Sequence, residues 1–290
     1  MVDLNEAILM GCETLSLHPT PHPDRPLSLT TLGLLHFERF RTTGSMADLE
    51  EAILMHRESL SLCPTPHSNR SASLSNLGLS LVNRFSMAGS ITGLEVAILV
   101  LRESLALRPK PHPDRFFSLS NLATALSGRF HQTRSMTDLQ EVILLHRESL
   151  SLCPTSHHYH SNSLYNLANA LQKRFEETGS MTDLEEAILL HRESLSFRPT
   201  PHPDRFDSLN ALARTLGDRF RKTGSMADLE EAISMLREAL SLDPAATHPR
   251  RQWVLKDLAP ILETRFKKNG SQSDFDEAIS LRQEIFAMSK

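Results

Sequence analysis

Apolar residues recur along the chain with the period of an amphipathic helix, in two kinds of segment that alternate. Within each segment the apolar residues fall mostly three or four positions apart, which places them on one face of a helix. The clearest examples are Leu49, Ala52, Ile53 and Leu60 in one segment, and Leu74, Leu77, Gly78, Leu81 and Phe85 in the next. The pattern therefore predicts pairs of amphipathic helices.

Both kinds of segment repeat at an interval of 45 residues. DLNEAI begins at residue 3, and close copies begin at residues 48, 93, 138, 183 and 228, with DFDEAI at 274. The second ladder begins with SLTTLG at residue 28 and recurs at residues 73, 118, 163, 208 and 254. One helix pair cannot bury its own apolar stripe, so neighbouring pairs must supply the core. We expect an all-α solenoid of stacked antiparallel helix pairs.

Residues that start and stop helices mark the predicted boundaries. Ser45 and Asp48 resemble a capping box that opens a helix, and Gly44 stands where a helix-ending left-handed residue is wanted. A Gly or Ala recurs in every first helix, which suggests that a neighbouring helix approaches closely there. We expect one array over residues 1–290, with an orphan helix at 3–17 and pairs at about 25–64, 70–109, 115–154, 160–199, 205–244 and 250–290.

This pattern resembles the tetratricopeptide repeat. The matching residues of one unit are Leu74, Leu77-Gly78, Leu81, Ala97, Leu105 and Pro109, although the unit has 45 residues where 34 is usual. The His-Pro-Asp segment before the first helix is similar to kinesin light chains, and long uniform arrays of this kind look like those of fungal proteins. The resemblance implies that the solenoid is a right-handed superhelix. It also implies a protein-interaction scaffold that binds a peptide or helix of a partner in a concave groove.

Alternatives from other classes stay open. In similar fungal proteins such arrays can precede a caspase-like peptidase domain, so the chain is alternatively a regulatory segment of a larger protein. Because the array starts and stops inside the repeat, we expect a fragment whose uncapped ends invite self-association. No phosphate-binding loop or uniquely placed nucleophile is found, so we expect no enzyme activity and no cofactor.

The segment PTPHPDR, at residues 19–25 and again at 199–205, is the most conspicuous candidate for chemistry. Its prolines end one helix and hold the linker extended, and Asp24 stands at the N-cap position of the next helix. The histidine recurs once per repeat, so the copies lie too far apart to share a metal. We interpret the segment as a turn in which His22 and its copies satisfy backbone groups.

Other histidines are weaker candidates. Cys153, His157, His158 and His160 form one dense cluster, which we interpret as a degenerate turn while leaving metal binding open. Cys153 precedes the proline that ends a second helix, and the residue at this position varies among Cys, Arg and Asp in the other repeats. This variation suggests that any residue is accepted there. His56, His146 and His191 share one second-helix position with Leu101 and Leu236, which indicates partly buried packing.

Composition and charge limit the classes of partner and the cellular location that we expect for this protein. The formal charge of −4 gives no basic surface for nucleic acid. No apolar run approaches the ~20 residues that span a bilayer, and the acidic N-terminus is unlike a signal peptide. Three cysteines make no disulfide framework, so we expect a cytoplasmic protein. A glutamate recurs on every second helix, such as Glu58, and an Arg precedes Phe on every first helix, such as Arg39. These charges either form a solvated face or, as we expect, some of them pair across helices.

Partner specificity is expected where the repeat copies differ on the first helix. Asn76, Asn121 and Asn166 occupy equivalent places in three consecutive first helices. An amide offers both a donor and an acceptor, which suits an extended peptide, but bonding within the solenoid is an equal alternative. The predicted groove contains Ser75, Asn76, Leu79, Val82, Ser120, Asn121, Thr124, Tyr165, Asn166, Asn169 and Arg214, and no metal ligand.

Overall fold

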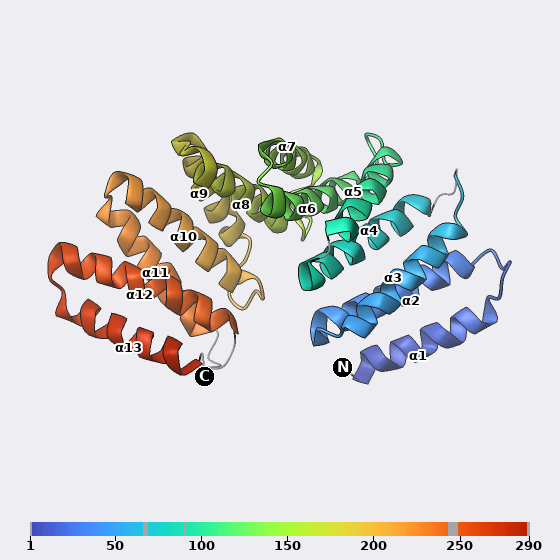
Figure 1. Cartoon of the computed structure of the whole chain (residues 1–290), viewed down its shortest axis with the longest axis horizontal. Coiled ribbons are helices and arrows are strands. Elements are labelled where there is room, and N and C mark those ends of the chain that lie inside the picture. Colours follow the sequence, from blue (N-terminus) through green and yellow to red (C-terminus); the bar gives the residue numbers. More distant parts are fainter. Residues whose placement is uncertain (1, 66–68, 90, 243–248, 289–290) are drawn as a thin grey trace. The chain divides into compact units, whose positions relative to one another are not determined.

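The computed structural model describes residues 2–65, 69–89, 91–242 and 249–288, which form helices joined by short turns, with no strand among them (Figure 1). None of the described helices is both long and apolar enough to cross a membrane. The helices are α1 (Val2–Leu17), α2 (Arg25–Thr43), α3 (Met46–Ser61), α4 (Arg70–Ala88), α5 (Ile91–Ala106), α6 (Arg115–Thr133), α7 (Met136–Leu152), α8 (His160–Thr178), α9 (Met181–Ser196), α10 (Arg205–Thr223), α11 (Met226–Leu242), α12 (Pro249–Asn269) and α13 (Gln272–Met288).

The chain divides into two compact units, residues 1–153 and 154–290, each built from successive helix pairs. Unit 1 holds α1 and the pairs α2–α3, α4–α5 and α6–α7; unit 2 holds α8–α9, α10–α11 and α12–α13. The two helices of a pair run antiparallel and make the most extensive contacts, and each pair packs on the next one within its unit. The predicted all-α fold of stacked helix pairs is confirmed. We call the even-numbered helices first helices and the others second helices.

Local signals set the helix ends as expected. The Ser45 hydroxyl accepts a hydrogen bond from the Asp48 backbone N–H at 3.3 Å, and Ser135 and Ser180 act in the same way. Gly44 ends α2 with a φ of +73° and donates its N–H to the Phe40 carbonyl at 2.7 Å. This left-handed residue satisfies a helix carbonyl that has no partner within the helix.

Where the small residue of a first helix is a glycine, it lies against a large residue of the second helix of the same pair. A Cβ placed on Gly33 would meet the His56 ring at 2.6 Å, and one on Gly78 would meet Leu101 at 2.4 Å. The predicted close approach is therefore confirmed, and it lets the leucine stripes interdigitate. Leu49, which the apolar period placed in the core, is fully buried.

Ion pairs join the helices, but the predicted partners were wrong. The guanidinium of Arg39 contacts the Asp48 carboxylate, with Nε donating at 3.0 Å. Arg39 holds the pKa of Asp48 below its usual range, against the opposing effect of burial. Glu58 instead accepts from Nε of Arg25 at 2.9 Å. Arg25, at the start of α2, also donates to the carbonyl of His18, so one arginine joins a turn, a first helix and a second helix.

Both ion pairs recur along the described chain. The short-range pair, nine residues apart, is repeated by Arg129–Asp138, Arg174–Asp183, Arg219–Asp228 and Arg265–Asp274. The pair that spans 33 residues is repeated by Arg70–Glu103, Arg115–Glu148, Arg205–Glu238 and Arg251–Glu284.

Candidate functional site

Within each unit the first helices lie next to one another and form a face, which we call the first-helix face of that unit. α4 contacts both α2 and α6, and α10 contacts both α8 and α12. Second helices of successive pairs are joined instead by exposed ion pairs, such as Arg102–Glu141 at 2.7 Å. Residues one repeat apart on the first helices therefore sit on neighbouring helices of one surface.

Two of the three asparagines predicted to bind a partner, Asn76 and Asn121, lie on this face in unit 1, and Asn166 lies on the first-helix face of unit 2. Asn76, Asn121 and Asn166 are half-buried. The described part of the chain supplies no hydrogen-bond partner to any of the three amides, although each amide has two donors and an acceptor. Three amides at equivalent positions are thus left with their hydrogen-bonding capacity unused.

A pocket of ≈ 320 Å³ brings two of these asparagines together in unit 1. It opens between α4 and α6, at the ends of the helices where they follow the turn. Its lining residues are Ala72, Ser75, Asn76, Arg108, Asp114, Phe117 and Asn121. The pocket therefore combines aromatic, amide and cationic groups at one place on the first-helix face.

Other predicted groove residues of unit 1 differ in how far they reach the surface. Ser75, Val82 and Ser120 are buried, and the Ser75 hydroxyl lies 2.8 Å from that of Ser104. Leu79 is half-buried, whereas Thr124 is exposed and its hydroxyl donates to a backbone carbonyl of α6. Among the predicted groove residues of unit 1, only the asparagines, Leu79 and Thr124 are therefore partly or fully exposed.

In unit 2 the predicted residues surround an aromatic side chain. The ring of Tyr165 lies over the Arg198 guanidinium at 5.1 Å and meets the His191 ring edge-on at 5.6 Å. Burial raises the pKa of Tyr165, while a hydrogen bond from the Asn169 side chain acts in the opposite direction. Arg214 is exposed and reaches the side-chain oxygen of Gln172 at 3.5 Å.

Sequence reasoning missed the buried arginines. Arg108 and Arg198 are 7% and 2% exposed, although they occupy the position before proline that was expected to accept any residue. Cys63 and Cys153 are buried at the same position. The expectation was wrong because this position points inward at serines of the neighbouring first helices. The sequence did carry an indication of a shared role, because the two arginines lie 90 residues apart, at the same position of two repeats.

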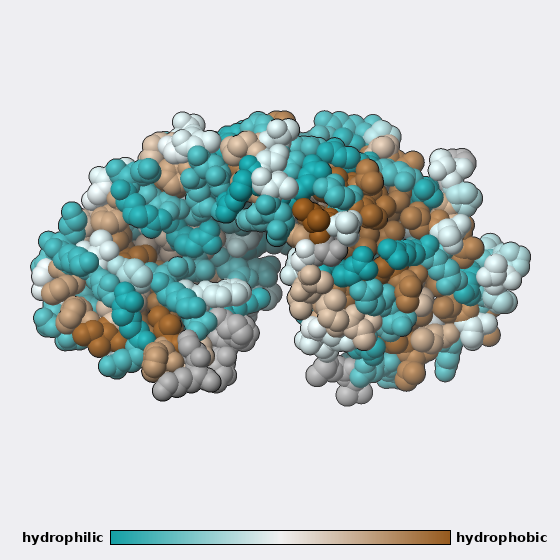
Figure 2. Space-filling view, in the orientation of Figure 1, coloured by the Kyte–Doolittle hydropathy of each residue, from teal (hydrophilic) through white to brown (hydrophobic). Residues whose placement is uncertain are grey.

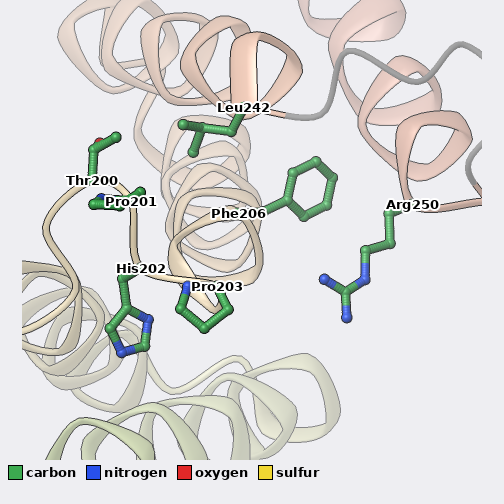
Figure 3. Close-up of a pocket in the computed structure, with 7 residues that line it drawn as sticks. All are labelled: Thr200, Pro201, His202, Pro203, Phe206, Leu242 and Arg250. Atoms are coloured by element: carbon green, nitrogen blue, oxygen red, sulfur yellow. The ribbon is translucent and has the colours of Figure 1, made fainter. Parts of the chain in front are cut away.

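The turn histidines act on the backbone, as predicted. Nδ1 of His22 accepts the Asp24 backbone N–H at 3.1 Å, and His112, His157 and His202 accept the equivalent N–H at the same distance. Asp24 stands at the N-cap position of α2, as predicted, but its backbone angles are helical and its side chain makes no capping hydrogen bond. In Figure 3 the ring of His202 lies beside Pro203, away from Phe206 and Arg250, in a turn that lines a pocket of ≈ 290 Å³.

Potential metal ligands gather at one place among the described residues, where His18, His22 and Asp24 lie together. The two rings stack with their centroids 4.3 Å apart. Nδ1 of His18 lies 2.7 Å from the Ser28 hydroxyl, and Nδ1 of His22 already accepts a backbone N–H. These contacts explain the residues as turn structure. In the Cys153, His157, His158 and His160 segment, His157 and His158 stack in the same way.

The second-helix histidines are more deeply buried than expected. His56, His146 and His191 are 1%, 4% and 0% exposed. Both ring nitrogens of His56 and His191, and Nδ1 of His146, lack a hydrogen-bond partner within the described chain. Burial lowers the pKa of His56 and His146 to about 4 and that of His191 to about 3, so all three rings are neutral and pack as apolar groups.

Comparison with known proteins gives a family match. Residues 27–67, 118–159, 161–204 and 206–250 match the model of the tetratricopeptide repeat, and these segments cover more than half of the chain. A comparison with the curated proteins finds no match.

Solved structures show the same fold. A putative kinesin light chain of Podosopora anserina with nearly identical TPR-like repeats is 20% identical, has a TM-score of 0.53, and aligns over 74% of this chain and 95% of that one. BtubC (BKLC) from P. vanneervenii is 15% identical, also with a TM-score of 0.53, over 85% of this chain and 94% of that one. At these identities the likeness concerns the fold.

Proposed function

Because the chain belongs to the tetratricopeptide repeat family, we propose that it is a protein-interaction scaffold that holds an extended segment of a partner along the first-helix face of a unit. The observation that carries this proposal is that the amides of Asn76, Asn121 and Asn166 have no hydrogen-bond partner among the described residues. Repeat proteins of this architecture commonly act as protein-interaction scaffolds, which supports the same use here.

The chemistry of an amide fits the backbone of an extended peptide. Each peptide unit presents one N–H and one C=O, and an asparagine side chain can accept from the first and donate to the second. Asn76 and Asn121 lie on neighbouring helices and line one pocket, so a single strand can engage both. Backbone recognition of this kind supplies affinity, and the variable neighbours Leu79 and Thr124 supply side-chain preference.

The test replaces the three amides together. A 12-residue peptide is first selected from a displayed random library against the wild-type chain, and its affinity is then measured by calorimetry for Asn76→Ala/Asn121→Ala/Asn166→Ala. Each lost hydrogen bond costs about 0.5–1.5 kcal/mol, so binding should weaken by roughly tenfold or more. The thermal midpoint should hardly change, because these amides hold no other helix in place.

A matched control uses three exposed leucines spaced by the same interval on the second helices. Leu54, Leu99 and Leu144 are 53%, 67% and 57% exposed, and their replacement by Ala should leave the peptide affinity unchanged. A triple asparagine variant that unfolds several degrees earlier while binding the peptide normally would show that the asparagines are structural.

A further inference from the structure

Two buried arginines, one in each unit, occupy the same place in the repeat and make the same three hydrogen bonds. In unit 1, Nε of Arg108 donates to Ser71 at 3.2 Å, and Nη1 donates to Ser118 at 2.9 Å and to the Asp114 carbonyl at 3.4 Å. In unit 2, Arg198 repeats these bonds with Ser161, Ser208 and the Asp204 carbonyl. Both guanidinium groups are thus held in the same way by their surroundings.

In unit 2 the chain itself completes the environment of the arginine. Nη2 of Arg198 donates to the side-chain oxygen of Asn162, and the Tyr165 ring covers the guanidinium. An aromatic ring over a partly desolvated guanidinium is a stabilising cation–π contact. Arg198 therefore has an acceptor for each nitrogen and a ring on its face.

In unit 1 the same two positions hold small residues. Ala72 replaces the asparagine and Ser75 replaces the tyrosine, each at the same distance in sequence from its arginine. Nη2 of Arg108 has no hydrogen-bond partner within the described chain, and the space beside it is the ≈ 320 Å³ pocket on the first-helix face. A donor on a side chain that is only 7% exposed therefore has no partner among the described residues where this pocket opens.

We propose that this pocket receives an aromatic side chain of the bound partner, whose ring covers the Arg108 guanidinium as Tyr165 covers Arg198. An amide or carbonyl oxygen of the partner, next to that side chain, then accepts from Nη2 of Arg108, as Asn162 accepts from Nη2 of Arg198 in unit 2. This inference rests on the proposed function and names the residue type that the first-helix face selects. Phe117, which lines the pocket from α6, supplies an apolar contact for the ring.

The charges of the pocket favour a neutral acceptor. Asp114 also lines the pocket, so a carboxylate brought next to Nη2 would meet a like charge. The acceptor that the chain uses for its own copy, Asn162, is an amide. A tyrosine, phenylalanine or tryptophan whose adjoining peptide carbonyl faces Arg108 meets both requirements.

Ligand-detected saturation-transfer NMR on the full chain tests this with N-acetyl-L-tyrosinamide, which carries a ring and amide oxygens. The amide should bind saturably, with the strongest transfer to its ring protons, and N-acetyl-L-alaninamide should show at least tenfold less transfer. The double variant Ala72→Asn/Ser75→Tyr copies the occupied site of unit 2 and should abolish the signal. It is expected to fold because unit 2 already contains this arrangement.

The reciprocal variant Asn162→Ala/Tyr165→Ser opens the space beside Arg198 and should raise the saturable transfer to the ring protons above the wild-type level. The gain should be less than twofold, because Asp207 stands where unit 1 has Phe117. Equal binding by the wild type and the filled variant, or no saturable binding to either, would overturn the proposal. These results are separable from the proposed function, because affinity for the library-selected peptide and its dependence on the asparagines are measured independently. Loss of peptide binding in the asparagine variant with no binding of the aromatic amide would leave the scaffold proposal standing alone.

Discussion

At the scale of single residues, burial decides the role of the polar side chains that recur in this chain. Arg108 and Arg198 are held inside by serines, whereas the exposed Arg102 pairs with a glutamate on the surface. His22 satisfies a backbone N–H in a turn, whereas His56 is enclosed without a partner. The same residue type therefore has different roles at different positions of the repeat.

The buried histidines predict acid sensitivity. His56, His146 and His191 have folded-state pKa values of about 4, 4 and 3, below the ordinary value near 6.5 in the unfolded chain. The unfolded state binds protons first, so stability is complete above pH ~6.5 and falls as the pH drops toward 4. Each histidine contributes on the order of 1 kcal/mol of loss per pH unit in that window.

Replacing all three histidines by leucine should remove this loss, because the same position accepts Leu101 and Leu236. Thermal midpoints measured from pH 7 to 4.5 should fall less steeply for the triple variant than for the wild type. The exposed His158 provides the control, since His158→Leu should leave the slope unchanged. Identical slopes for wild type and triple variant would mean that other groups control the acid response.

At the scale of helices and pairs, periodicity and caps predicted the elements closely but not their polar contacts. The apolar stripe, the serine caps and the terminal glycines are local signals, so the helices begin and end near the predicted residues. Ion-pair partners depend on distances between helices, so sequence spacing did not distinguish Arg25 from Arg39 as the partner of Glu58. The pocket at Arg108 was missed because arginine is ordinarily exposed, so the residue type alone did not place this side chain inside the fold.

The helix contact at the small residue predicts opposite effects for two glycine substitutions. Gly78→Ala adds a Cβ that would lie 2.4 Å from Leu101, and such overpacking costs about 1–3 kcal/mol. Gly217→Ala places its Cβ no closer than 3.8 Å to any described side chain, so the better helix propensity should add up to about 1 kcal/mol. Urea midpoints should shift down for Gly78→Ala and up for Gly217→Ala. A rise for both would show that the neighbouring helix yields freely.

At the scale of the whole molecule, two surfaces compete as the place where a partner binds. The second helices carry a row of exposed leucines, Leu54, Leu99 and Leu144 in unit 1 and Leu189 in unit 2. Figure 2 shows apolar surface over α4 and α5, and mostly hydrophilic surface over α9 and α10. The first-helix face offers fewer exposed apolar groups but holds the unpaired amides and the Arg108 pocket. We favour the first-helix face because its amides can make directional hydrogen bonds to the backbone of a bound peptide.

Site-specific photocrosslinking separates the two surfaces most directly. A benzophenone amino acid is placed at Leu79 or Thr124 on the first helices, or at Leu54 or Leu99 on the second helices, and each variant is irradiated with the library-selected peptide. The scaffold proposal predicts crosslinks from Leu79 and Thr124, and none above background from Leu54 and Leu99. Crosslinks from Leu54 and Leu99 alone would contradict it and assign partner binding to the second-helix face.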